Sequence, residues 1–295
     1  METKIYDTLL SLGLASKATS YVFSNSTRDI DNLEVWRDHN SNVIYIKDHY
    51  VGDQQYKDSS YRKWSPVGTK DHDFEERRDV VRRFNAYKSY LWDKKVCDFG
   101  CGSGQILKQI KDISLEAIGI EIQEKHLIDL KKNDIKCYQD FQPEHENYFD
   151  TISVFHVLEH LPDPLSLLSQ IYRSLKIGGK IIVEVPHAND FLLREFLDCE
   201  SYKNFTLWSQ HLVLHTRNSL TAFLRKVGFE VEIINGVQRY PLSNHLNWLA
   251  NGKPGGHKGV LSNIDSPSLL EHYSAALNKI DATDTLVAIA TKIQR

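Results

Sequence analysis

The sequence predicts an α/β fold in which a mostly parallel sheet carries helices on both faces. Short apolar runs alternate with helical patterns from residue 95 onward, which is the rhythm of parallel strands joined by helices. A glycine-spaced turn, Gly100 to Gly104, connects the first of these runs to the helical pattern that follows it. Gly178 and Gly179 end a later helical pattern immediately before another strand.

The length and composition are those of a globular protein. A chain of 295 residues can form one large domain, or one domain with a smaller appendage. With 41% apolar and 25% charged residues, it can bury an ordinary core. The net charge of −3 and the lack of a concentrated basic cluster argue against a nucleic-acid substrate. Arg77, Arg78, Arg82 and Arg83 are expected to form a solvated helix edge.

Targeting and redox features favour a cytoplasmic protein. The sequence has no apolar run of about 18 or more residues and no signal-peptide pattern, so no membrane association is expected. The four cysteines have neither disulfide nor zinc-site spacing, and a reducing compartment is the simplest interpretation.

Residues 1–70 form an N-terminal extension that lacks the alternating pattern. They contain a helical pattern near Ile5–Leu14, a strand-like run at Val43–Ile46 and several tyrosines, among them Tyr61. The extension is expected either to pack its aromatic side chains against the main domain or to form a lid over the ligand site. The sequence leaves both open, and for a lid Tyr61 is a candidate contact to the substrate.

The main domain spans residues 71–295 and contains a late insert at residues 237–284. It opens with a helical pattern at Asp73–Trp92. Its predicted strands are Lys95–Phe99, Ala117–Glu121, Lys136–Tyr138, Phe149–Phe155, Lys180–Val185, Phe229–Ile234 and Thr285–Thr291. The helices predicted between them are Gln105–Lys111, Glu124–Lys132, Pro164–Leu175 and Ser219–Val227, the last ended by Gly228.

The glycine turn and the next strand together predict a nucleoside-containing cofactor. The glycines follow Asp98 with the spacing G-x-G-x-G, and Gln105 stands where a dinucleotide fingerprint would have its third glycine. Glu121 ends the next strand about 17 residues after Gly104, near the distance at which an acid meets a ribose. Its carboxylate can accept hydrogen bonds from both ribose hydroxyls.

These motifs and the order of the elements resemble the class I S-adenosylmethionine-dependent methyltransferases. The resemblance covers about residues 73–295. The segment Phe149–Pro164 is especially similar to the group that contains quinone and sugar methyltransferases. The resemblance implies a Rossmann-like sheet of seven strands with the last strand antiparallel, and S-adenosyl-L-methionine as cofactor, with S-adenosyl-L-homocysteine as its product.

The resemblance also implies which residues hold the cofactor. The glycines let the backbone approach the methionine part, Asp98 attracts its ammonium group and Glu121 accepts from the ribose. The set is Asp98, Gly100, Gly102, Gly104, Glu121, Ile122 against the adenine, Asp140 at the adenine amino group, and Phe155 through its backbone carbonyl. For Asp140, capping of the turn before Phe141 is the alternative.

Histidines supply the candidates for a general base, since an acceptor hydroxyl has to lose a proton. His160 and His187 follow the fourth and fifth strands, at the edge where such a sheet binds ligands, and are the predicted catalytic residues. His211, together with His215, precedes the Ser219 helix, and His211 is a predicted contact to the substrate. A structural or acceptor-binding role stays open for each of them.

No metal is predicted. The string from His156 to His160 matches the H-x-x-E-H pattern of some zinc peptidases, but here it leaves a strand toward a Pro-Asp-Pro turn. Some quinone methyltransferases place metal ligands in this segment, with an acid where this chain has His156. Magnesium prefers oxygen ligands, so the histidine argues against such a site.

The predicted activity is methyl transfer to a small molecule. Arg239 and His245 in the insert suit an anionic, hydroxylated acceptor, although the insert is alternatively a surface helix and loop. O-methylation of a sugar, sugar nucleotide or phosphorylated acceptor, in surface-polysaccharide or secondary metabolism, is the preferred interpretation. An N- or C-methyltransferase and a non-catalytic partner subunit that binds the cofactor are the alternatives. The sequence leaves a homodimer open.

Overall fold

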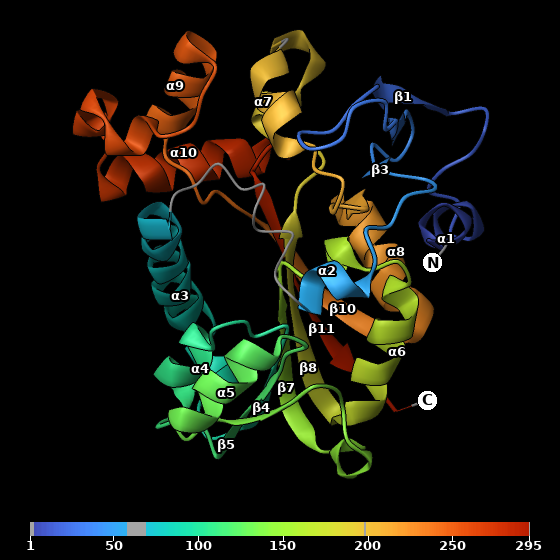
Figure 1. Ribbon diagram of the computed structural model, residues 1–295, viewed down its shortest axis with the longest axis vertical. Helices are drawn as coiled ribbons and strands as arrows, with labels where there is room; N and C mark the ends of the chain where they lie inside the picture. The colour runs from blue at the N-terminus through green and yellow to red at the C-terminus, as the bar shows by residue number, and fades with distance from the viewer. Residues whose placement is uncertain (1–2, 58–68, 198, 295) are drawn as a thin grey trace.

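The computed structural model describes residues 3–57, 69–197 and 199–294, and only the backbone of residues 69–74. Tyr61, predicted to contact the substrate, lies outside the described residues. A seven-stranded sheet forms the centre of the molecule, in the order β10-β11-β8-β7-β4-β5-β6 (Figure 1). Its strands are β4 (Lys95–Phe99), β5 (Glu116–Ile120), β6 (Lys136–Tyr138), β7 (Phe149–Phe155), β8 (Leu175–Pro186), β10 (Phe229–Val237) and β11 (Thr285–Lys292).

The topology of this sheet confirms the predicted fold class. The strands β6, β5, β4, β7 and β8 are parallel to one another, and β11 is antiparallel to both of its neighbours. The chain builds outward from β4 through β5 to β6, then returns to place β7 and β8 on the other side of β4. The strand order therefore reverses between β4 and β7, and such a sheet binds its ligand beyond the carboxyl ends of the strands at this point.

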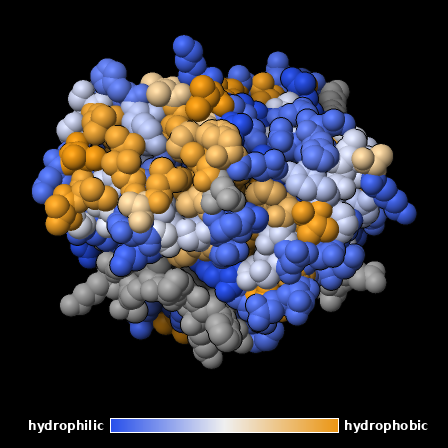
Figure 2. Space-filling model, turned by 90° about the horizontal axis from the view of Figure 1, so that it is seen from above, coloured by the Kyte–Doolittle hydropathy of each residue, from blue (hydrophilic) through white to orange (hydrophobic). Residues whose placement is uncertain are grey.

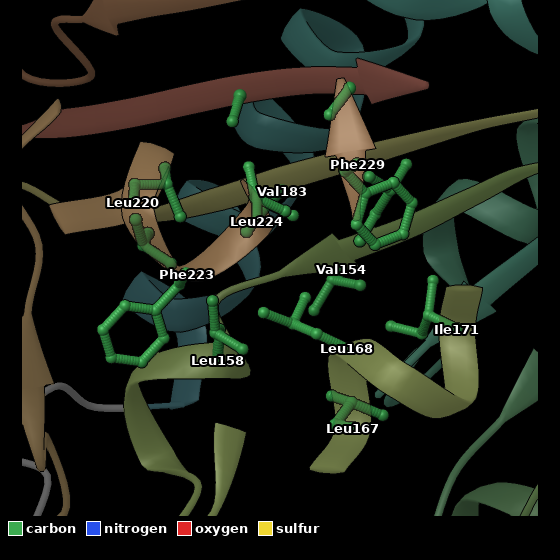
Figure 3. Close-up of a cluster of buried hydrophobic side chains, with 14 of the residues drawn as sticks. Val154, Leu158, Leu167, Leu168, Ile171, Val183, Leu220, Phe223, Leu224 and Phe229 are labelled. Carbon is green, nitrogen blue, oxygen red and sulfur yellow. The ribbon is translucent and has the colours of Figure 1, made fainter. Parts of the chain in front are cut away.

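Helices cover both faces of the sheet, as predicted (Figure 1). On one face lie α3 (Thr69–Leu91), α4 (Gln105–Ile110) and α5 (Glu124–Lys132), whose apolar side chains pack on Val96, Ile182 and Val287. On the other lie α6 (Pro164–Ser174) and α8 (Arg217–Val227). Figure 3 shows this second core, in which Phe223 of α8 and Leu168 of α6 meet Val154 and Val183 of the sheet.

The ends of these helices follow from their sequences. Asp163 precedes α6 and accepts a hydrogen bond from the backbone N–H of Ser166, and Pro164 takes the first helical position. Gly228 ends α8 with a φ of 117°, a left-handed conformation that glycine adopts without steric cost. The chain can therefore reverse directly into β10.

A second, smaller sheet attaches the N-terminal extension to the main domain. Its order is β1 (Ser20–Ser24), β2 (Val35–Asp38), β3 (Ile44–Tyr45) and β9 (Val213–Leu214), and every pair is antiparallel. Because β9 immediately precedes α8, the start of the chain hydrogen-bonds to its later half. Helix α1 (Ile5–Ser11) adds to this contact, since Ile5 and Leu9 are fully buried in the core beneath α6 and α8.

The late insert is helical and carries an apolar surface. It contains α9 (Leu242–Asn251) and α10 (Pro267–Lys279), and Trp248 of α9 packs on α7 (Glu200–Thr206). Figure 2 shows apolar atoms gathered over the side of the molecule formed by α9 and α10. The exposed large apolar residues of the described insert are Leu246, Leu249, Val260, Ile264 and Ile280. Within the described part of the chain, no helix is long and apolar enough to cross a membrane.

Candidate active site

The glycine turn after β4 is shaped by three positive φ angles. Gly100, Gly102 and Gly104 have φ values of 72°, 54° and 69°, which residues with a Cβ atom rarely adopt. A Cβ atom on Gly100 would lie 2.4 Å from Val157, and one on Gly104 would lie 2.2 Å from Leu130. A Cβ on Gly102 would have no atom within 4 Å, so this glycine faces open space. The turn thus leaves room for a ligand beside Gly102.

Glu121 ties the end of β5 to this turn. The side chain is buried, and its Oε2 accepts a hydrogen bond from the Gly102 N–H at 2.8 Å. Its Oε1 accepts from the Gln123 N–H, also at 2.8 Å. Each oxygen of a carboxylate has a second lone pair, so Glu121 can still accept from the two hydroxyls of a ribose.

Asp98 is a second buried carboxylate beneath the turn. It is 3% exposed, and the Ser153 hydroxyl donates to its Oδ1 at 2.6 Å. Burial raises the pKa of Asp98 to about 6, although the hydrogen bond from Ser153 and the charge of Arg83 oppose the shift. A cationic ligand group beside it would stabilise the ionised form.

The other predicted cofactor residues follow β5, β6 and β7 at the same edge. Ile122 is 39% exposed and available for contact. Asp140 is exposed, and its Oδ1 accepts from the Phe141 N–H at 2.7 Å, which is the turn-capping geometry. The Phe155 ring stacks with the Tyr87 ring, with centroids 6.0 Å apart, and the Arg83 guanidinium lies 4.5 Å from the Phe155 ring centroid.

A buried ion cluster centred on Glu184 of β8 adjoins this edge. Glu184 is fully buried, and the Nη2 atoms of Arg82 and Arg83 each lie 2.7 Å from its Oε1. Burial opposes ionisation, but these arginines and His156 hold the pKa of Glu184 well below its usual range. The expectation that Arg82 and Arg83 form a solvated helix edge was wrong, since both guanidinium groups turn inward to this carboxylate.

His156 links Glu184 to a second buried carboxylate. It directly follows β7 with a φ of 54°, a conformation that a non-glycine residue keeps only where its surroundings demand it. Its Nε2 lies 3.2 Å from Glu184 Oε1 and its Nδ1 lies 3.2 Å from Glu159 Oε1. Burial opposes protonation, yet the two carboxylates raise the pKa of His156. Burial likewise opposes ionisation of Glu159, and His156 brings its pKa down to about 2.

His160 has a defined tautomer when it is neutral. Its Nδ1 lies 2.9 Å from the Gln210 carbonyl oxygen, which can only accept, so Nδ1 carries the proton. The lone pair is therefore on Nε2, 4.0 Å from Glu159 Oε1. Burial lowers the pKa of His160, which keeps the imidazole neutral near pH 7. The ring is surrounded by Tyr56, Trp208 and His211 at centroid distances of 5.8, 6.2 and 4.9 Å.

His211 and Glu159 meet His160 in one cluster. One ligand atom from each of the three lies within 4.8 Å of the other two. His211 Nδ1 and Glu159 Oε2 are buried and make no hydrogen bond to any described residue. Two imidazoles and one carboxylate suit zinc better than magnesium. His156 already supplies a cationic partner to Glu159, and the absence of a metal stays a prediction.

The remaining predicted residues lie in packed surroundings. His187 is 1% exposed, its Nδ1 donates to the Thr283 carbonyl at 2.9 Å, and burial lowers its pKa to about 4. His245 is 3% exposed, hydrogen-bonds to Tyr273 at 2.6 Å and stacks on Phe191. Arg239 pairs with Asp79 of α3. The structure therefore brings His160 and His211 together at the sheet edge and leaves His187 and His245 inside the protein.

Comparison with known proteins gives one family and several named relatives. Residues 71–233 match a family model described as a methyltransferase domain. The ubiquinone biosynthesis O-methyltransferase of Thiobacillus denitrificans is 23% identical over 211 residues, which cover 64% of this chain and 87% of that protein. The enzyme of the same name from Idiomarina loihiensis is 30% identical over 112 residues, 34% of this chain and 45% of that protein.

Two of the solved structures with similar folds are named as methyltransferases. A SAM-dependent methyltransferase from Archaeoglobus fulgidus has 22% identity and a TM-score of 0.49, covering 74% of this chain and 98% of its own. A possible histamine N-methyltransferase from Thermotoga maritima has 21% identity and a TM-score of 0.49, covering 79% and 95%.

Proposed function

The chain belongs to the S-adenosylmethionine-dependent methyltransferases, and we propose that it methylates a hydroxyl oxygen of a small molecule. The observation that carries this proposal is the His160 imidazole, whose Nε2 lone pair lies at the sheet edge beside β7. A hydroxyl is a weak nucleophile and needs a base to take its proton during transfer. Relatives from Thiobacillus and Idiomarina named as O-methyltransferases support oxygen as the acceptor atom.

The residues at the edge fit the cofactor of this family. Gly102 faces open space and Glu121 keeps two lone pairs. Asp98 is a buried carboxylate that no cationic group of the described residues hydrogen-bonds. We propose that these three hold the methionine part, the ribose and the ammonium group of S-adenosyl-L-methionine, respectively. We also propose that Ile122 lies against the adenine, that Asp140 contacts the adenine amino group, and that Phe155 contacts the cofactor through its backbone carbonyl. When bound, the cofactor supplies an electrophilic methyl group.

His160 would act on the acceptor in this arrangement. Its Nδ1–H stays bonded to the Gln210 carbonyl, which fixes the ring while Nε2 takes the hydroxyl proton. The Glu159 carboxylate, 4.0 Å from Nε2, stabilises the imidazolium that results. His211, whose Nδ1 has no hydrogen-bond partner among the described residues, is proposed as a contact to the acceptor. We do not assign a base function to His187, because the packed protein surrounds it.

The acceptor class we propose is a sugar, a sugar nucleotide or another phosphorylated compound. Arg82 and Arg83 of α3 pair with Glu184 beside the carboxyl-terminal edge of the sheet, and their guanidinium groups would suit an acceptor with an anionic group.

We propose a reducing, cytoplasmic location because all four cysteines are free thiols. The alternative to O-methylation is methylation of a nitrogen or carbon atom. In that reaction His160 would not be needed as a base, or the base would be another residue.

Cofactor binding should weaken at acidic pH because of Asp98. With a pKa of about 6, most Asp98 side chains are ionised at pH 7 and only about a tenth at pH 5. The ligand ammonium group stays protonated over this range. Affinity for S-adenosyl-L-homocysteine should therefore fall about tenfold between pH 7 and pH 5 in calorimetric titrations. The Asp98→Asn variant should bind S-adenosyl-L-homocysteine weakly, with an affinity that depends little on pH. The same dependence of affinity on pH in both proteins would contradict the proposed contact between Asp98 and the ammonium group.

Replacing the proposed base tests the function itself. His160→Gln should lower kcat by about 10²- to 10⁴-fold while leaving cofactor affinity within a factor of two or so. The assay follows a labelled methyl group from the cofactor to a panel of catechols, sugars and sugar nucleotides. His272→Gln on the exposed face of α10 is the matched control. Full activity of His160→Gln on a hydroxyl acceptor would overturn the proposed role.

A further inference from the structure

Buried polar atoms without partners gather where the N-terminal extension meets the segment after α7. Arg28 lies in the loop that follows β1, and its backbone N–H donates to the Leu207 carbonyl at 2.7 Å, which joins this loop to the end of α7 (Figure 1). Arg28 Nε, Gln210 Oε1 and His211 Nδ1 are buried and hydrogen-bond to no described residue. Polar atoms are costly to bury unsatisfied, so this place is suited to a polar ligand.

Arg28 carries a positive charge that no carboxylate of the described residues neutralises. Its guanidinium carbon lies 4.6 Å from the centroid of the Trp208 ring and 5.2 Å from that of Phe205. Within residues 3–57, 69–197 and 199–294, the half-buried side chain makes neither a hydrogen bond nor an ion pair. The adjacent carboxylate of Asp29 accepts instead from the Ser209 N–H at 3.0 Å and the Ser209 hydroxyl at 2.6 Å. The guanidinium is therefore available to a ligand anion.

The Trp208 ring lies beside both Arg28 and the proposed base. Its centroid is 6.2 Å from that of His160 and 5.5 Å from that of His211. The charge of Arg28 also acts on His211. Burial lowers the pKa of His211 to about 3, and repulsion from Arg28 and from protonated His160 adds to this shift. Arg28 thus belongs to the same cluster as the base, which it approaches from the N-terminal extension.

The cluster has opposite charges at its two ends. Glu159, beside His160, is fully buried, and its Oε2 makes no hydrogen bond within the described part of the chain. Gln210 is 2% exposed and offers a second unoccupied oxygen. Both oxygens can accept from the hydroxyls of a ligand, whereas the carboxylate would repel an anion. A bound acceptor should therefore turn hydroxyls toward Glu159 and an anionic group toward Arg28.

We propose that Arg28 binds the anionic group of the methyl acceptor and so selects acceptors that are hydroxylated acids, with Glu159 and Gln210 accepting from their hydroxyls. The inference rests on the proposed function, and it gives the N-terminal extension a part in recognising the acceptor. A guanidinium presents parallel N–H donors that match two oxygens of a carboxylate or a phosphate.

Calorimetric titration with three related sugars tests this proposal without any methyl transfer. Glucuronate, glucose-6-phosphate and glucose share one ring and differ in the group at the sixth carbon. In the presence or absence of S-adenosyl-L-homocysteine, the wild type should bind at least one charged sugar about tenfold or more tightly than glucose. The charged sugar that binds more tightly identifies carboxylate or phosphate as the group recognised.

Variants of Arg28 separate recognition of charge from a structural role. Arg28→Gln should bind the charged sugars and glucose with affinities within about a factor of two of each other, because the amide has no charge. Arg28→Lys should keep part of the preference, since it keeps the charge without the planar fork. Arg225→Gln, which changes an exposed arginine of α8, should keep the full preference of the wild type.

A wild type that binds the three sugars equally overturns the proposal. It is also overturned if Arg28→Gln weakens binding of glucose and the charged sugars alike, which is the result expected of a structural role. A preference that depends on Arg28 supports the proposal even if no acceptor is methylated. Methyl transfer to a neutral acceptor, with no preference for charged sugars, supports the methyltransferase function and overturns the role of Arg28.

Discussion

Replacing Glu121 with alanine should weaken binding of S-adenosyl-L-homocysteine by about 10- to 150-fold, the effect of losing about 1.5–3 kcal/mol of hydrogen bonds to a charged group. We expect the loss of affinity to lie near the upper end of this range. Glu121 accepts from the N–H groups of Gly102 and Gln123, in addition to its proposed role toward the ribose. Its loss would remove both the proposed ribose acceptor and the hydrogen bond from Gly102 that fixes the glycine turn.

Isothermal titration calorimetry with three variants separates these contributions. Glu121→Gln keeps the size of the side chain and one oxygen, so its affinity should fall between those of the wild type and Glu121→Ala. Glu124→Ala, three residues later in the exposed first turn of α5, is the matched control and should bind normally. Unchanged affinity in Glu121→Ala would contradict the placement of the ribose.

The sheet could be predicted from the sequence because its strands are continuous apolar runs bounded by turn residues. The predicted bounds of Lys95–Phe99, Lys136–Tyr138 and Phe149–Phe155 agree with β4, β6 and β7. The pairing of β3 with β9 could not be predicted, because a strand of two residues has no periodicity and its partner lies far along the chain. Long-range pairing of this kind depends on the folded core rather than on local pattern.

The candidate site likewise has one part that could be predicted from the sequence and one part that could not. The predictable part is the local motif of Asp98, the glycines and Glu121, because its spacing alone indicates a turn that binds a nucleoside-containing cofactor. The His156–Glu184 cluster joins side chains that lie far apart in the sequence, and Arg82 and Glu184 are 102 positions apart. One signal pointed to it, since Glu184 is a charged residue between Val183 and Val185 in a buried strand. A buried carboxylate requires cationic partners, although the sequence does not say which.

Replacing Glu184 with glutamine should lower the free energy of unfolding by about 3–5 kcal/mol, the usual cost of breaking a buried ion pair. The carboxylate is fully buried and is shared by Arg82, Arg83 and His156. The amide cannot balance their charges, so cationic groups remain at a site with little access to water. Urea unfolding followed by circular dichroism measures the difference.

The dependence of this difference on pH is a sharper test than its size. The pKa of Glu184 lies well below its ordinary value of 4.5 in the folded protein, so the carboxylate stabilises the fold fully above about pH 5. That stabilisation is lost as the pH falls below 4.5 toward the folded-state pKa, so wild type and Glu184→Gln should converge in acid. Glu232→Gln, which breaks the exposed pair with Lys180, should cost no more than about 1 kcal/mol. A Glu184 variant as stable as the Glu232 variant at pH 7 would show that the buried cluster is not a determinant of stability.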